Sequence, residues 1–129
     1  MEKQGMVSLW LGRISSETEL DELMNVNYSE DGDFVPSKFA QCFSITRYDD
    51  ATREAEFYEK PQESIEGLLE GFSYDDCIIP KYKEFPIERE LTEYNCVILL
   101  YNYVYDNVMK NSNERESYFE FVGSVDYMS

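Results

Sequence analysis

The hydrophobic and polar positions along the chain follow two periods, which separate the expected strands from the expected helices. Within residues 6–13 the apolar side chains alternate, so that Leu9 and Leu11 share one face of a strand. Trp10 lies on the opposite face, where we expect it to anchor the helices by packing. In the next segment, Leu20, Leu23 and Met24 have the three- and four-residue spacing of a helix with one apolar side. The pattern therefore predicts a strand followed at once by a helix.

The junction between these two elements, LGRISSETEL, has the local form of a phosphate-binding turn. A glycine and two serines precede a helix whose first N–H groups are free to meet an anion. One glycine is too few for a phosphate cradle, no lysine follows it, and the acidic residues of the next turn repel anions. Ser16 and Glu19 have instead the spacing of a capping box. The sequence therefore predicts a capped helix at this junction.

The rest of the chain continues the succession of helices and strands. An almost unbroken apolar run at residues 94–105, YNCVILLYNYVY, is typical of a central strand covered on both faces. We expect a polar loop over residues 106–117 and then a last strand over residues 118–127, antiparallel to the central strand and next to it. The other predicted elements are a short helix starting at Pro36, a strand over residues 54–60, and helices over residues 63–71 and 75–84.

The order of these elements, β-α-α-β-α-α-β-β, predicts an α+β fold. We expect about four strands in one mixed or antiparallel sheet, with the helices packed on it. The chain has 129 residues, the length of one domain, so we expect a single domain over residues 1–129. Apolar residues make up 43% of the chain and aromatic residues 16%, which is enough for a core and argues against disorder.

The chain is strongly acidic, with 27 acidic and 11 basic residues and a formal net charge of −16. Such a surface repels nucleic acid and anionic membranes and attracts cations or basic proteins, although the same charge can serve solubility alone. No apolar segment reaches the length of a signal peptide core or the roughly 20 residues of a membrane span. The three cysteines lie far apart among apolar neighbours, as reduced core thiols do. We therefore expect a cytoplasmic protein.

The chain lacks the residues that most enzymes use. It contains no histidine, which removes the commonest general base and the commonest metal ligand. No two cysteines lie close enough for the usual zinc spacings. Residues 27–33 match the start of a calcium-binding loop, but Lys38 stands where its bidentate glutamate belongs. We therefore predict no catalytic residues, no metal site and no cofactor, while weak cation binding by the loop acids stays open.

Five segments of the chain form an ordered set, namely MVSLWLGRISSETELDELM, YSEDGDFVPSKFAQCF, SIEGLLEGFSYDDCIIP, YNCVILLYNYVYD and FEFVGSVDY. In this order they resemble the bacterial immunity protein 22 family, formerly a domain of unknown function, from about Met6 to Tyr127. The resemblance implies an α+β protein of the cytoplasm that belongs to a polymorphic toxin system. It implies that the protein protects its producer by binding a toxin domain, and it implies no particular binding residues.

These observations lead to three hypotheses about function. The first is a non-enzymatic immunity protein that inhibits a cognate toxin stoichiometrically, the favoured target being a basic nuclease because its active site is built to hold phosphates. The second is an acidic regulatory or scaffold protein, or a mimic of nucleic-acid charge, that binds basic proteins without a dedicated toxin. The third is an enzyme that uses carboxylates and a divalent metal. The oligomeric state stays open.

The predicted contacts with the toxin lie in loops, where the alternative for each residue is a solvated turn. Tyr101, Tyr103 and Tyr105 are predicted to share one face of the central strand, as core packing or as a platform for a partner. The candidate partner-binding residues are Glu30, Asp31, Asp33, Asp49, Asp50, Tyr74, Asp75 and Asp76.

Overall fold

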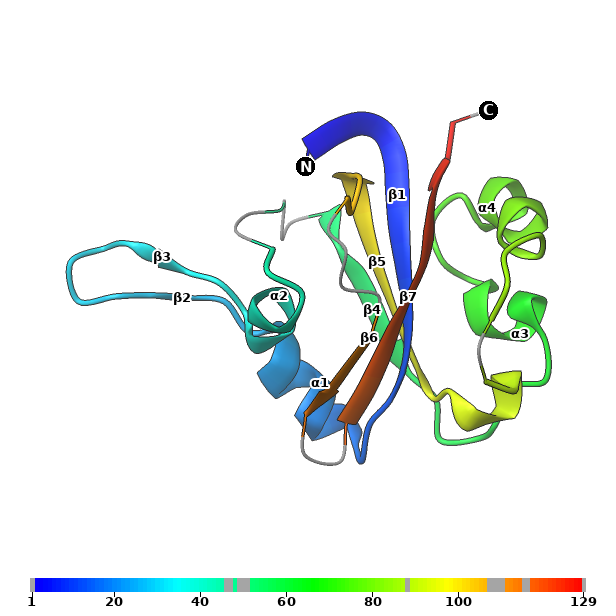
Figure 1. The fold of residues 1–129 in the computed structure, drawn as a ribbon, viewed down its shortest axis with the longest axis horizontal. Coiled ribbons are helices and arrows are strands. Elements are labelled where there is room, and N and C mark those ends of the chain that lie inside the picture. Colours follow the sequence, from blue (N-terminus) through cyan, green and yellow to red (C-terminus); the bar gives the residue numbers. More distant parts are fainter. Residues whose placement is uncertain are drawn as a thin grey trace.

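A five-stranded antiparallel sheet forms the centre of the fold, in the strand order β4-β5-β1-β7-β6. It is seen in a computed structural model that describes residues 2–45, 48, 52–87, 89–106, 111–114 and 117–128. The strands are β1 (Glu2–Arg13), β4 (Glu54–Phe57), β5 (Cys96–Tyr103), β6 (Asn111–Glu114) and β7 (Ser117–Asp126). Helices lie on both faces of the sheet (Figure 1), so the predicted α+β class is confirmed.

The helices are short, and three of them begin at a serine that caps the first turn. They are α1 (Glu17–Met24), α2 (Lys38–Cys42), α3 (Ile65–Leu69), α4 (Asp75–Tyr82) and the 3₁₀ helix η2 (Leu91–Glu93). The hydroxyl oxygens of Ser16, Ser37 and Ser64 each accept the N–H of the third residue that follows, at 3.2, 3.1 and 3.0 Å. Each such cap stabilises its helix by about 1 kcal/mol. The predicted cap at Ser16 is confirmed. Among the described residues, no helix is long and apolar enough to cross a membrane.

The position of β1 corrects one sequence prediction. The strands expected over residues 94–105 and 118–127 are not neighbours, because β1 lies between them and pairs with both. The physical reason is that β1, like β5, carries a continuous buried run, here Val7 to Gly12, so both strands occupy the covered middle of the sheet. The strand that pairs with the outer side of β7 is β6, which lies within the segment expected to be a polar loop.

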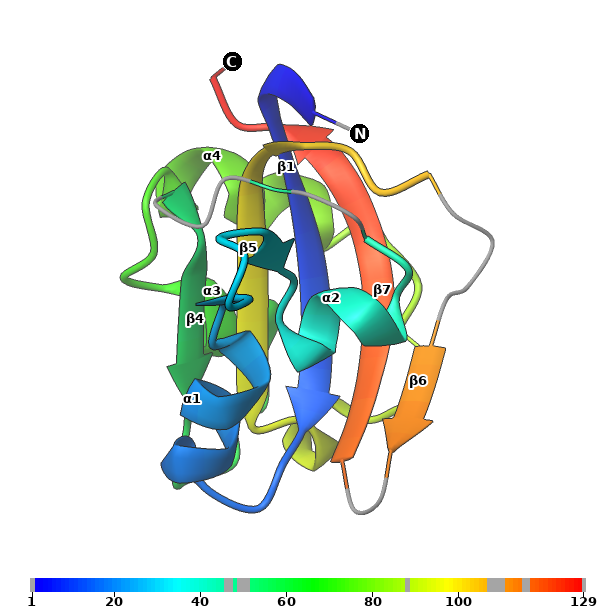
Figure 2. The same ribbon diagram turned by 90° about the vertical axis from the view of Figure 1, so that its left-hand side faces the viewer.

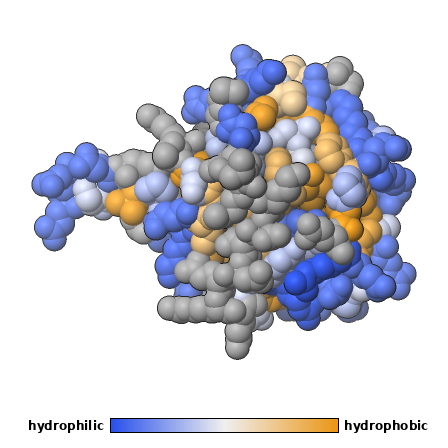
Figure 3. All heavy atoms as spheres, viewed as in Figure 1, coloured by the Kyte–Doolittle hydropathy of each residue, from blue (hydrophilic) through white to orange (hydrophobic). Residues whose placement is uncertain are grey.

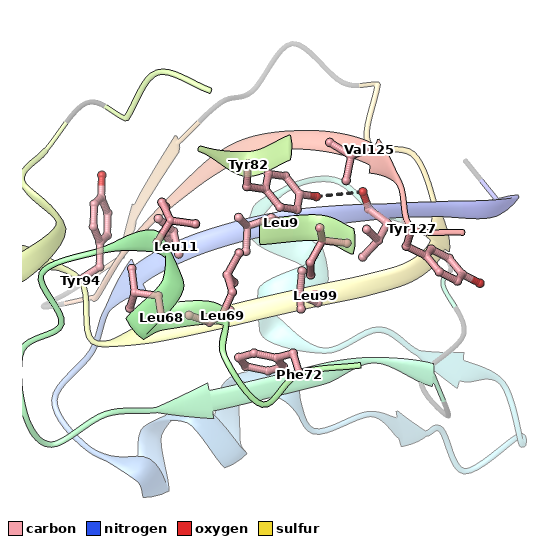
Figure 4. Packing of buried hydrophobic residues seen from close by; sticks show 14 of the residues in the cluster. Leu9, Leu11, Leu68, Leu69, Phe72, Tyr82, Tyr94, Leu99, Val125 and Tyr127 are labelled. Atoms are coloured by element: carbon pink, nitrogen blue, oxygen red, sulfur yellow. Dashed lines mark hydrogen bonds between the residues drawn. The ribbon is translucent and has the colours of Figure 1, made fainter. Parts of the chain in front are cut away.

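The side chains on the two faces of β1 belong to two separate hydrophobic clusters. On one face, Leu9 and Leu11 pack with Leu68 and Leu69 of α3 and with Tyr82 of α4 (Figure 4). The opposite face packs against α1 and α2. Figure 1 shows the two pairs of helices on opposite sides of the sheet. The alternating residues of β1 that the sequence indicates therefore belong to two different cores.

Trp10 is the largest side chain of the core on the α1 and α2 side. It is fully buried and packs edge-on against Phe39, Phe43 and Tyr105, with ring centroids between 5.1 and 5.7 Å from its own. Such pairs stabilise beyond their buried area, since the positive edge of one ring meets the negative face of another. The predicted role of Trp10 as a packing anchor against the helices is confirmed.

Replacing Trp10 with alanine is expected to lower the free energy of unfolding by about 3–5 kcal/mol, because the cavity left behind is lined by rings that cannot close on it. Urea denaturation followed by far-UV circular dichroism measures this loss. Tyr28→Ala is the control, since its side chain is 70% exposed and its removal is expected to change stability by no more than about 0.5 kcal/mol. Equal effects of the two changes would contradict the anchoring role of Trp10.

Candidate partner-binding surfaces

A hairpin formed by β2 (Asn27–Tyr28) and β3 (Phe34–Val35) extends away from the sheet on the side of α1 and α2 (Figure 1). Its turn is held by backbone hydrogen bonds. The Ser29 N–H donates to the Asp33 carbonyl at 2.7 Å, and the Gly32 N–H donates to the Ser29 carbonyl at 2.9 Å. Gly32 has a φ of +84°, in the left-handed region that glycine enters without a Cβ clash. The end of the hairpin therefore has a defined shape.

Three of the predicted contact residues, Glu30, Asp31 and Asp33, lie in this turn with exposed side chains. Figure 3 shows hydrophilic residues over the end of this arm. Carboxylates so far out in water attract a positively charged partner from a distance, while each single contact contributes little because water screens it. The hairpin acids therefore act more through their combined charge than through any single contact.

A second predicted cluster, Tyr74, Asp75 and Asp76, lies at the start of α4. The Asp75 carboxylate accepts the Gly71 N–H at 2.9 Å and the Asp76 N–H at 2.8 Å. It therefore closes the turn before the helix and is engaged within its own chain. Asp76 is exposed, and Tyr74 is 53% exposed with a φ of +62°.

Three tyrosines from distant parts of the chain meet beside this turn. The ring of Tyr74 lies 4.7 Å from that of Tyr127 and 6.2 Å from that of Tyr101, and the latter two rings are 5.2 Å apart. They line a cleft of about 400 Å³, here called the tyrosine cleft, whose other lining residues are Thr52, Arg53, Glu54, Ser73 and Asn102. Aromatic rings of this kind are the commonest anchors in protein interfaces.

Asn102 lines this cleft and interrupts the alternation of β5 just after Tyr101. Tyr101 follows the regular alternation of β5 and joins the core on the α3 and α4 side, as Leu99 does. Beyond the φ of +60° at Asn102, Tyr103 and Tyr105 join the other core. The predicted single face for these three tyrosines is therefore wrong. The Asn102 side-chain oxygen accepts the Tyr127 hydroxyl at 2.7 Å and a backbone N–H of β1 at 3.0 Å, which holds the irregular strand end in place.

Glu54 at the start of β4 supports the floor of the cleft. Its two carboxylate oxygens accept the Ser73 N–H at 3.0 Å and the Ser73 hydroxyl at 3.2 Å. The Tyr101 hydroxyl donates to the Ser73 carbonyl at 2.8 Å. Burial, and then the neighbouring Glu54 carboxylate, raise the pKa of Tyr101, so its hydroxyl keeps its proton as a donor. The cleft is therefore built on fixed side chains.

A family model described as Immunity protein 22 matches residues 7–128 of the chain. The chain belongs to the Immunity protein 22 family. No curated protein and no solved structure matches it. Membership gives the protein a general role in neutralising a toxin, with that toxin as its partner, and confirms the resemblance seen in the sequence.

In this member of the Immunity protein 22 family, the predicted contact residues lie in separate places. Figure 1 shows the hairpin and α4 on opposite sides of the molecule, so the acids of residues 30–33 and those of residues 75–76 do not form one patch. Asp49 and Asp50 lie outside the described residues. Sequence reasoning missed Glu54 and Tyr127 as parts of a site, because nothing in the chain pattern indicates that β4 and the end of β7 lie beside Tyr74.

Metal ligands and reactive thiols are the features of the described residues that bear on catalysis. No group of three or more Asp, Glu or Cys side chains among them is placed to hold a metal ion. Burial raises the pKa of the Cys96 thiol, which disfavours the thiolate that a nucleophile needs. The family likewise supports an inhibitor's role for this chain.

Replacing Asp75 with alanine is expected to lower the free energy of unfolding by about 1 kcal/mol, because the Gly71 and Asp76 N–H groups lose their acceptor. Asp76→Ala is the matched control, since Asp76 is exposed and its removal is expected to change stability by no more than about 0.5 kcal/mol. Chemical denaturation of both variants measures the difference. An Asp75→Ala variant as stable as the control would show that the turn does not depend on this carboxylate.

Proposed function

We propose that the protein neutralises a cognate toxin domain by binding it in a one-to-one complex, and that this toxin is a basic nuclease. The family match over residues 7–128 is the observation that supports the immunity role. The net charge of −16 is the reason for proposing a basic target. The chain acts in the cytoplasm as one immunity-protein domain over residues 1–129. It performs no catalysis, and neither nucleic acid nor a membrane is its partner.

Electrostatics explains why a strongly acidic inhibitor suits such a toxin. A nuclease carries basic residues around its active site, because these hold the phosphates of its substrate. An acidic partner is steered toward the same surface and associates at up to ~10⁸ M⁻¹s⁻¹ at low salt. Rapid association matters for a protein that must bind a lethal enzyme before it acts.

The contacts are divided between surfaces of different kinds. The hairpin acids Glu30, Asp31 and Asp33 approach the toxin first, since they project farthest into water. Tyr74 and Asp76 supply an exposed ring and an exposed charge beside the tyrosine cleft, and Asp75 acts by holding their turn. The pair Asp49 and Asp50 completes the proposed set of contacts.

The direct experiment mixes the purified protein with the toxin domain encoded by the neighbouring gene. Isothermal titration calorimetry is expected to give one-to-one binding, and the activity of the toxin is expected to disappear at the same ratio. Absence of binding and of inhibition across physiological salt would overturn the proposal. An unrelated basic protein is the control, and equal binding to it would favour the alternative of a general acidic scaffold.

Neutralising the hairpin tests its share of the association. The variant Glu30→Gln, Asp31→Asn and Asp33→Asn is expected to associate several-fold more slowly at low salt, with little change in the dissociation rate, because exposed charges act mainly through steering. Stopped-flow or surface plasmon resonance measures both rates.

The matched control removes three other exposed acids, on α1, by Glu17→Gln, Asp21→Asn and Glu22→Gln. This change alters the net charge equally, so it isolates the position of the charges from their number. If both triple variants slow association by the same factor, the hairpin has no special part in capture.

A further inference from the structure

The outer side of β4 is an edge of the sheet that the described residues form. Within the described part of the chain, β4 has a hydrogen-bonded neighbour on one side only, which is β5. Figure 2 shows β4 as the outermost strand, with helices over the two faces of the sheet. Such an edge presents a row of backbone donors and acceptors to any extended chain that comes beside it.

The register identifies which backbone groups face outward. The Tyr58 N–H donates to the Asn95 carbonyl at 2.8 Å, so Tyr58 directs its backbone groups toward β5. In an antiparallel pair the residues alternate between facing the partner and facing away. Glu56 and Glu54 therefore face β5, and the N–H and C=O of Ala55 and Phe57 face the outer edge.

A groove follows this edge on the α3 side of the sheet. Its volume is about 470 Å³, and it runs between β4 and the turn at residues 70–72. It shares Arg53 and Glu54 with the tyrosine cleft, so the two hollows adjoin. Together they are called the edge groove. A strand added beside β4 places alternate side chains over this groove, because side chains of a strand point to the two faces in turn.

The charge of the edge groove limits what it can hold. Its charged lining residues are three glutamates and one arginine, namely Glu54, Glu56, Glu70 and Arg53. The side chains of Glu56 and Glu70 are exposed. A second copy of this chain would bring its own β4 glutamates and its own net charge of −16 to the same edge, and like charges across a strand pair are destabilising. A positively charged segment meets no such repulsion.

We propose that the edge groove holds an extended, positively charged segment of the toxin, which adds to β4 as a strand and places a cationic side chain against the rings of the tyrosine cleft. The proposal rests on the proposed function, since the toxin is the partner. The backbone of Ala55 supplies sequence-independent pairing. The tyrosine rings and the glutamates select for a cationic side chain, by cation–π attraction and by charge.

Amide hydrogen exchange on the complex tests the strand addition. On binding of the toxin domain, exchange of the Ala55 amide is expected to slow by about ten-fold or more, because its N–H gains a backbone acceptor. If the protein alone forms a dimer in analytical ultracentrifugation and already protects this amide, the occupant is a second copy and the proposal is wrong.

Charge reversal in the groove provides an independent measurement. Glu56→Lys is expected to weaken binding by about ten-fold or more, because a lysine repels the cationic segment. Glu84→Lys makes the same charge change at an exposed position after α4, outside the groove, and is expected to stay within about two-fold of the unmodified protein. Thermal unfolding of both variants checks that each is folded.

The ring of Tyr74 gives the third comparison. Tyr74→Ala is expected to weaken binding by about ten-fold, while Tyr74→Phe, which keeps the ring, restores most of the affinity. If the unmodified protein binds and inhibits the toxin while Ala55 exchange is unchanged and Glu56→Lys behaves as Glu84→Lys does, the edge groove is not the site and the immunity role stands. If the unmodified protein does not bind the toxin, both proposals fail.

Discussion

The burial of β1 on both faces is the constraint on which the rest of the structure depends. Its side chains alternate between two cores, so helices must cover both sides of the sheet: α3 and α4 cover one side, and α1 and α2 cover the other. Even its buried polar residue is used: the Ser8 hydroxyl donates to the Tyr103 carbonyl at 2.8 Å and accepts the Tyr105 N–H at 3.2 Å. The Ser8 hydroxyl thus provides hydrogen-bond partners for backbone groups just where β5 leaves the sheet. A buried N–H without an acceptor there would destabilise the fold.

The tyrosine cleft follows from this centre through two irregular features. The Tyr82 hydroxyl of α4 donates to the carbonyls of Val7 and Gly123 at 3.0 and 3.1 Å, which fixes the helix against β1 and β7. The start of the same helix carries Tyr74. At the end of β5, Tyr101 lies on the same side by the alternation of the strand, and the left-handed Asn102 after it accepts the Tyr127 hydroxyl beside the cleft. The cleft therefore exists where helix and strand depart from ideal repeats, which is typical of sites that a rigid scaffold holds in place.

What the sequence predicted correctly was encoded locally. The alternation around Trp10 and the serine cap at Ser16 depend on residues within one turn or one strand, and both are found in the structure. The pairing of β1 with both β5 and β7 depends on contacts about a hundred residues apart, which no local pattern contains. The faces of Tyr103 and Tyr105 depend on the backbone of Asn102, and asparagine adopts the left-handed region in some strands and not in others. The cleft was missed because its lining residues, Tyr74, Tyr101 and Tyr127 among them, come from distant parts of the sequence.

Under the proposed function, the separation of the hairpin from the edge groove gives the two acidic surfaces different physical tasks. Exposed carboxylates at the end of an arm are fully hydrated, so they raise the rate of encounter and contribute little to the lifetime of a complex. The edge groove instead offers backbone pairing, aromatic rings and carboxylates beside apolar surface, where the exclusion of water strengthens each contact. Because the two surfaces lie on opposite sides of the sheet, a toxin held in the groove has no need to touch the hairpin. Under the proposed function, the net charge of −16 therefore governs capture, and the few residues around Tyr74 and β4 govern retention and specificity.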